Sequence, residues 1–237
     1  VPPGSAAAAV GIGAAGPVDV DEGVIHPVNL RGVRGFALRD TVSALVGDAL
    51  PVVVGHDGGC LALAEAWIGA TAGARASMSI VVSTGVGGGF VFGGAPLRGA
   101  SGNAGHLGQT RSGPATLEER ASGPATVAWA RERGWRGSTG EELGAAAAAG
   151  DRIAREAVER SAALVGGALA DAATLLDLDV VAVGGGFSRV CPDYVDLVAA
   201  AARATAVLPY AQRLRVVPSG LGDEGPLIGA GALALQS

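Results

Sequence analysis

The 237-residue sequence predicts an α/β fold, because strand-like and helix-like segments alternate along the whole chain. Residues 76–82 form a nearly continuous apolar run, as expected of a central strand that is covered on both faces. Residues 151–176 carry apolar side chains along one side of a long helical pattern. No long linker separates these segments, so the class is α/β throughout.

In the first half of the chain, glycine and proline mark where each element ends. Residues 36–50 are predicted to be helical because Leu38, Val42, Leu45 and Val46 recur at three-to-four spacing. Strands are predicted over residues 10–14, 24–25, 51–54, 76–82 and 90–92, with a hairpin turn at 93–94 and a helix starting near residue 61. Residues 26–35 and 96–113 lack periodicity and are interpreted as loops.

In the second half, helix starts are indicated by cap residues. Ser138 or Thr139 precedes a helical pattern with Glu141 and Glu142 in its first turn. Helices are predicted over residues 116–133 with a break at 122–124, 139–149, 151–176, 194–206 and 226–235. The strands that complete this half are predicted over residues 179–183 and 213–217.

Composition excludes several function classes. The net charge of −5, without a basic cluster, argues against nucleic acid as a partner of this portion. Residues 1–9 have no basic segment of a secretory signal, and no apolar run approaches the ~20 residues of a membrane helix. The cysteines, Cys60 and Cys191, offer neither a zinc spacing nor a disulfide framework, which fits a cytoplasmic location.

The first candidate site lies in residues 51–65, PVVVGHDGGCLALAE, around Asp57. An aspartate at the carboxyl end of a buried strand lies where open α/β folds place their chemistry. Asp57 is therefore a candidate general base. The alternative, that Asp57 caps the following helix, remains open at this point.

Two glycine-rich turns are candidate phosphate or nucleotide contacts. Residues 84–89, TGVGGG, connect two strands, and their glycines let backbone N–H groups approach an anion closely. Residues 184–186, GGG, follow a strand and precede a helix, a placement that suits a nucleotide. In both places a plain tight turn is the alternative.

A third candidate site combines His106, Gln109 and Glu118, which are polar side chains within or just after the glycine-rich segment 99–109. Ligands rich in hydroxyl groups need such convergent donors and acceptors on a rigid frame. The alternative interpretation is a solvated loop.

Together these motifs resemble the ROK family of bacterial sugar kinases and related repressors. The resemblance rests on GIGAAGPVD, an Asp followed by small residues and ALAE, STGVGGG, AGHLG, LEERASGPA and VVAVGGG, in the order of the family. It covers nearly the whole chain. It implies a two-lobed actin-like ATPase (ribonuclease-H-like) fold, with a small lobe over residues 1–57, a large lobe over 58–225, and a C-terminal helix, 226–237, that returns to the small lobe.

The resemblance also implies residue roles. Asp57 matches the catalytic base of the family. The other matches are Thr84, Gly85, Gly87 and Gly88 for phosphate, Gly184, Gly185 and Gly186 for adenosine, and Gly16, Asn29, His56, His106, Gln109 and Glu118 for the sugar.

The sequence departs from the family pattern in three places. His56 replaces an Asn, and the Glu-x-Gly-His sugar motif becomes His106-Leu-Gly-Gln109. The cysteine-rich zinc motif is replaced by residues 110–116, so no structural zinc is expected. The first phosphate motif, Asp-x-Gly-Gly-Thr, does not occur, and the N-terminal strands that carry it are expected to be either outside this sequence or lost in a degenerate member.

The resemblance thus implies ATP- and Mg²⁺-dependent phosphorylation of a hexose, with glucose converted to glucose 6-phosphate, by a homodimer or homotetramer without membrane contact. A sugar-sensing transcriptional regulator and a non-catalytic sugar-binding pseudokinase are the alternatives. The sequence leaves open which hexose is used and whether ATP or polyphosphate is the donor.

Overall fold

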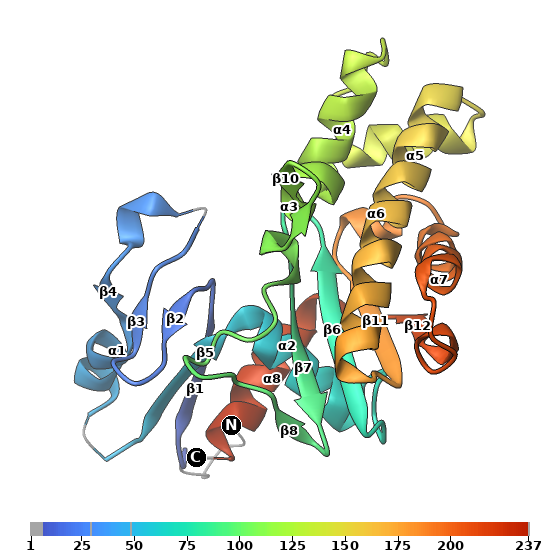
Figure 1. Cartoon of the computed structure of the whole chain (residues 1–237). Coiled ribbons are helices and arrows are strands. Elements are labelled where there is room, and N and C mark those ends of the chain that lie inside the picture. Colours follow the sequence, from blue (N-terminus) through green and yellow to red (C-terminus); the bar gives the residue numbers. More distant parts are fainter. Residues whose placement is uncertain (1–6, 29, 48, 237) are drawn as a thin grey trace.

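The computed structural model describes residues 7–28, 30–47 and 49–236, and it is a mixed α/β structure (Figure 1). Its largest sheet has the strand order β12-β11-β6-β7-β8. The strands are β6 (Ala76–Val82), β7 (Val86–Phe92), β8 (Ala95–Pro96), β11 (Val180–Gly184) and β12 (Arg215–Pro218). β12, β11 and β6 are parallel, whereas β7 and β8 continue as antiparallel hairpins. The prediction of a buried central strand over residues 76–82 is confirmed.

Helices pack against this sheet or on other helices, and they supply most of the core. They are α2 (Asp57–Ile68), α3 (Leu117–Ala121), α4 (Gly123–Glu132), α5 (Gly140–Ala148), α6 (Arg152–Leu176) and α7 (Tyr194–Thr205). Of the two predicted cap residues, Thr139 is the cap and forms a capping box with Glu142. Asp151, predicted as the first residue of α6, is instead its N-cap. Ser122 caps α4 and separates it from α3, which explains the predicted break in that helix.

β9 (Arg111–Ser112) and β10 (Ala115–Thr116) form a short hairpin beside α3, whereas strands β1 to β5 lie to one side of the large sheet, at the left of Figure 1. β1 (Val10–Ala14) and β5 (Val52–His56) form a parallel pair, while β2 (Val18–Asp19), β3 (Val24–Ile25) and β4 (Phe36–Ala37) form an antiparallel sheet next to α1 (Leu38–Val46). Asn103 ties the two sides together, because its side-chain amide both accepts the Val18 N–H and donates to the Val18 carbonyl, each at 2.8 Å.

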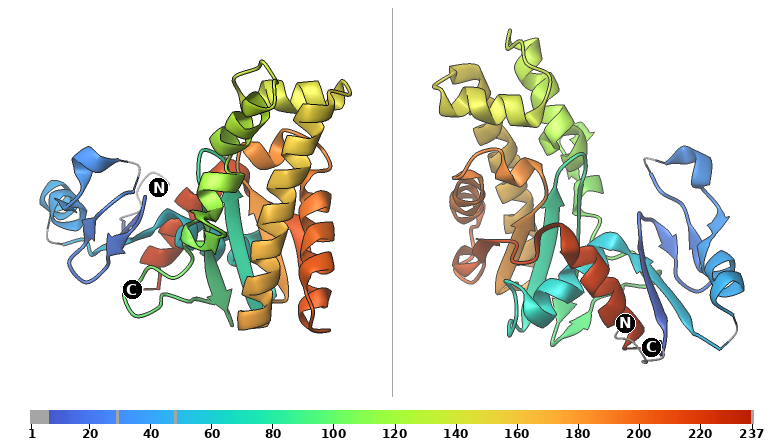
Figure 2. Two further views of the ribbon diagram at one scale, coloured as in Figure 1. Left: turned by 45° about the horizontal axis from the view of Figure 1, so that its top comes forward. Right: turned by 180° about the vertical axis from the view of Figure 1, so that it is seen from behind.

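α8 (Gly225–Ala234) lies beside α2 and against β1 and β5, as the view from behind shows (Figure 2, right). Glycines allow this close approach: a Cβ at Gly11 would collide with the Ala230 carbonyl, and a Cβ at Gly229 would collide with the Cys60 carbonyl. The domain boundaries after residues 57 and 225 remain a prediction.

Three elements differ from the sequence-based predictions. The helix expected over residues 36–50 begins at Leu38, because Phe36–Ala37 pair with β3, and it ends at Val46. The helix expected near residue 61 already begins at Asp57, directly after β5. Gly87, Gly88 and Gly89 lie in strand β7 rather than in a loop, because they pair with residues 79–81 of β6.

Candidate functional site

Asp57 lies at the junction between β5 and α2, where it is exposed and lines a cleft. The preceding residue, His56, is the N-cap: its Nδ1 accepts the Gly59 N–H at 3.1 Å. Asp57 Oδ1 accepts the N–H of Gly58 at 2.7 Å. The capping function that could have explained Asp57 is thus supplied by its neighbour, which leaves the Asp57 carboxylate at the cleft.

Backbone contacts between glycines bring three segments together at this point. A Cβ at Gly58 would lie 2.5 Å from the Gly88 carbonyl oxygen, and one at Gly89 would lie 2.6 Å from the Gly58 oxygen. A Cβ at Gly105 would also collide with the Gly88 oxygen. Since only glycine permits such approaches, the start of α2, strand β7 and the loop before His106 pack with their main chains in contact.

The cleft has a volume of about 270 Å³. Its lining combines apolar residues with a few polar side chains, a composition typical of small-molecule sites. Its polar side chains are Asp57, His106, Gln109 and Glu118, its glycines are Gly16, Gly58, Gly85 and Gly87, and its apolar residues include Pro27, Val28, Leu30, Leu61, Val81 and Pro226. The structure therefore brings together most of the residues that the sequence assigned to sugar and phosphate.

Glu118 is held in place by two hydrogen bonds. Its Oε2 accepts the Val86 N–H at 2.9 Å, and its Oε1 accepts the Gln109 side-chain amide at 3.2 Å. Glu118 thereby connects α3 to the start of β7 and to the segment that follows His106.

A second cavity, of about 310 Å³, shares with the first the turn over residues 83–87. It is lined by Ser83 and Thr84, by Gly123 and Pro124 at the start of α4, by Thr139, Gly140 and Glu141 at the start of α5, and by Gly186, Phe187 and Val190. Ser83 and Thr84 thus face the second cavity, whereas Gly85 and Gly87 face the first. Two ligands bound in these cavities would meet at the turn.

The turn over Gly184, Gly185 and Gly186 packs beneath the end of β6. Gly185 has a φ of +98°, and a Cβ there would lie 2.5 Å from the Val82 carbonyl oxygen, so packing alone requires glycine at this position. Of the three glycines, only Gly186 lines the second cavity.

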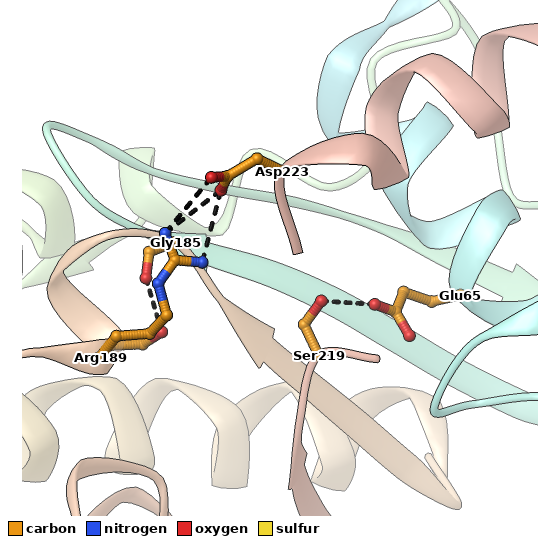
Figure 3. Close-up of polar contacts among 6 residues, drawn as sticks. Glu65, Gly185, Arg189, Ser219 and Asp223 are labelled. Carbon is orange, nitrogen blue, oxygen red and sulfur yellow. Dashed lines mark hydrogen bonds and ion pairs between the residues drawn. The ribbon is translucent and has the colours of Figure 1, made fainter. Parts of the chain in front are cut away.

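Figure 3 shows polar contacts that sequence reasoning missed. Glu65 is fully buried in α2. Its carboxylate accepts the N–H groups of Ala70, Gly220 and Leu221 and the hydroxyl of Ser219. Beside it, Arg189 forms an ion pair with Asp223 at 3.3 Å. The only signal for Glu65 was a lone acid at the end of the apolar run 61–64, since three of its four partners, residues 219–221, are about 155 residues away.

Four predicted site residues, His56, Gly88, Gly184 and Gly185, line neither of the two cavities. His56 is 6% exposed and does not line the cleft. Both of its ring nitrogens are engaged, because Nε2 also lies 3.0 Å from the Ala104 carbonyl. Gly88 is buried within β7. Asn29 lies outside the described residues.

In the part of the chain that the structure describes, no three His, Cys, Asp or Glu side chains are grouped as metal ligands would be. Within the same residues, none of the helices has the length and apolarity to cross a membrane.

Comparison with known proteins gives a consistent result. The sequence model of the ROK family matches residues 3–237. The glucokinase of Halalkalibacterium halodurans is 30% identical over 96% of this chain and 76% of its own length. The N-acetylmannosamine kinase of Yersinia pestis is 34% identical over 90% of this chain and 74% of its own length.

Solved structures similar to this chain also belong to the ROK family. A ROK family glucokinase from Streptomyces griseus in complex with glucose and AMPPNP has a TM-score of 0.86 and 31% identity, over 99% of this chain and 83% of the other. A ROK family transcriptional regulator has a TM-score of 0.82 and 25% identity, over 93% of this chain and 60% of the other. These matches confirm the actin-like ATPase fold that the resemblance implied.

Proposed function

The chain belongs to the ROK family, and on that premise we propose that it is an ATP-dependent sugar kinase that phosphorylates glucose at its 6-hydroxyl. The observation that carries the proposal is the turn over residues 83–87, which has a cavity on each side. A sugar in the first cavity, beside Asp57, would face a nucleotide in the second across a stretch of glycine backbone.

In the proposed reaction, Asp57 accepts the proton of the sugar hydroxyl while that oxygen bonds to the γ-phosphorus of Mg²⁺-bound ATP. The bond between the γ-phosphorus and the β-phosphate oxygen breaks, and ADP leaves with the electron pair. Gly87 offers room for the phosphates, because no atom lies within 4 Å of where its Cβ would be. Mg²⁺ bound with the nucleotide would neutralise part of the phosphate charge.

We assign recognition of the sugar to the polar side chains that line the cleft. His106, Gln109 and Glu118 supply donors and acceptors for hydroxyl groups, and Gly16 leaves space beside them. Asn29 belongs to the same proposal by its match to the family. We propose glucose rather than N-acetylmannosamine as the substrate, because the structure of the similar Streptomyces griseus enzyme contains glucose.

The decisive experiment is a coupled assay of ADP release over a sugar panel that includes glucose and N-acetylmannosamine, with polyphosphate as an alternative donor. Asp57→Asn should lower kcat by about 10²-fold or more, as loss of a general base does. Asp171→Asn, on the exposed face of α6, is the matched control and should leave turnover unchanged. Sugar-dependent turnover that survives Asp57→Asn would refute the assignment of the base.

The similar transcriptional regulator supports a second candidate, a sugar sensor. Saturable sugar binding in calorimetry, without turnover for any sugar or phosphate donor, would favour the sensor over the kinase.

A further inference from the structure

One nitrogen in the cleft has no partner. His106 Nε2 is buried and makes no hydrogen bond to the residues that the structure describes. The His106 ring nevertheless lines the cleft. Because a polar atom that is buried without a partner is unfavourable, such an atom at a ligand site indicates where a ligand group belongs. Gly16 packs against this edge of the ring, since a Cβ there would lie 2.9 Å from Nε2.

The neighbouring imidazole, that of His56, differs because both of its ring nitrogens are hydrogen-bonded. His56 Nδ1 accepts the Gly59 N–H, so the ring proton resides on Nε2, which donates to the Ala104 carbonyl at 3.0 Å. With both nitrogens engaged and the side chain buried, His56 has nothing to offer a sugar. Its bonds join the start of α2 to the loop that carries His106.

The two rings are also stacked, with centroids 5.3 Å apart and an interplanar angle of 28°. His56 therefore constrains His106 twice, through the Ala104 backbone two residues before it and through the ring face. Removing the His56 ring would free both constraints without removing any group that faces the cleft.

We infer that His56 is a positioning residue, which holds the His106 ring in place for the sugar contact that the proposed function assigns to His106. This inference rests on the proposed sugar-binding function. A hydroxyl both donates and accepts, so it satisfies Nε2 in either tautomer of His106, whereas a deoxy position cannot. A site of this kind discriminates against analogues that lack the hydroxyl.

The kinetic test uses His56→Asn. Asparagine keeps an oxygen that can cap α2, but it lacks the ring that stacks on His106 and the Nε2–H that reaches Ala104. We expect the KM for glucose to rise about tenfold, the effect of losing one hydrogen bond. The KM for ATP should stay constant, and kcat should fall far less than with Asp57→Asn.

A double-mutant cycle with His106→Ala separates positioning from general damage. His106→Ala should raise the KM for glucose at least as much, and adding His56→Asn should have little further effect, because His56 acts through His106. Additive effects in the double variant, or an equal loss of ATP affinity in His56→Asn, would overturn the inference.

Imidazole ¹⁵N NMR tests the inference without requiring turnover, and the spectrum is simple because the chain has three histidines. On titration with glucose or N-acetylmannosamine, the His106 nitrogen should shift while those of His56 and the exposed His26 stay in place. Turnover without a His106 shift would refute the inference and leave the kinase function standing. A His106 shift without turnover would refute the kinase function and leave the inference standing. The absence of both turnover and a His106 shift would refute both proposals.

Discussion

The His56 imidazole is held in its neutral form, and this has consequences for stability. Burial, followed by the neighbouring His106, lowers the pKa of His56 from its ordinary value of 6.5. A proton on Nδ1 would also abolish the acceptor for the Gly59 N–H. The native protein therefore resists protonation at a group that the unfolded chain protonates readily.

Native stability should fall as the pH drops below 6.5. From there down to the lowered native pKa, the unfolded state binds a proton that the native state does not, and each pKa unit of difference costs about 1.4 kcal/mol. Urea unfolding at pH 7.5 and 5.5 would measure this. His56→Asn should lose less stability over that interval than the wild type, and parallel profiles would contradict the explanation.

Gly87 and Gly88 are neighbours with different roles, and alanine should separate them. A Cβ at Gly88 would collide with the Ser79 carbonyl and lie 2.9 Å from Ile80 Cγ2, so Gly88→Ala should cost roughly 1–3 kcal/mol of stability. A Cβ at Gly87 would enter the open cleft. Gly87→Ala should fold normally but weaken the binding of ATP or sugar, and thermal melts beside KM values would show the difference.

At the residue scale, the sequence predicted which side chains line the cleft better than it predicted the hydrogen bonds that those side chains and their neighbours make. The residue types predicted a polar site from Gln109 and Glu118, and the resemblance to the ROK family joined Asp57 to it; the cleft contains all three. No sequence pattern indicated that both His56 ring nitrogens would bond within the protein, because the Ala104 carbonyl is 48 residues away.

At the scale of elements, Glu65 fixes the segment that leads into α8. Its four hydrogen-bond donors come from the turn after α2 and from residues 219–221. Gln in its place presents an amide to donors that need an acceptor. Glu65→Gln should therefore cost roughly 2–4 kcal/mol.

Ser219→Ala removes a single donor to Glu65 and is the matched control, with an expected cost of about 1 kcal/mol. Urea unfolding of both variants would give the comparison. Equal costs for the two would show that the carboxylate is not what holds residues 219–221.

Elements with local signals were predicted well. A cap residue at 138–139 with two acids in the first turn indicated α5, and the continuous apolar run indicated β6. The strand over Gly87–Gly89 could not be predicted, because glycine favours loops locally and only pairing with β6 makes these residues a strand.

At the scale of the whole molecule, long-range contacts decide how strands β1 to β5 are joined to the part of the protein that contains the large sheet. Asn103 bonds to Val18 across 85 positions of sequence, and α8 returns from the chain end to β1. No periodicity encodes such contacts. The two-lobed arrangement was accessible from the sequence only through the resemblance to the ROK family.

The two cavities on either side of residues 83–87 predict that sugar and nucleotide stabilise the native state together. A ligand at 100 times its Kd adds about 2.7 kcal/mol, which corresponds to roughly 5–10 °C in Tm for a chain of this size. Glucose and AMPPNP should each raise the Tm, and both together should raise it by more than the sum if each ligand helps to order the shared turn. Asp57→Asn should retain these shifts, since it removes a proton acceptor and not a cavity. A Tm that neither ligand changes, measured by differential scanning fluorimetry, would contradict ligand binding at these two cavities.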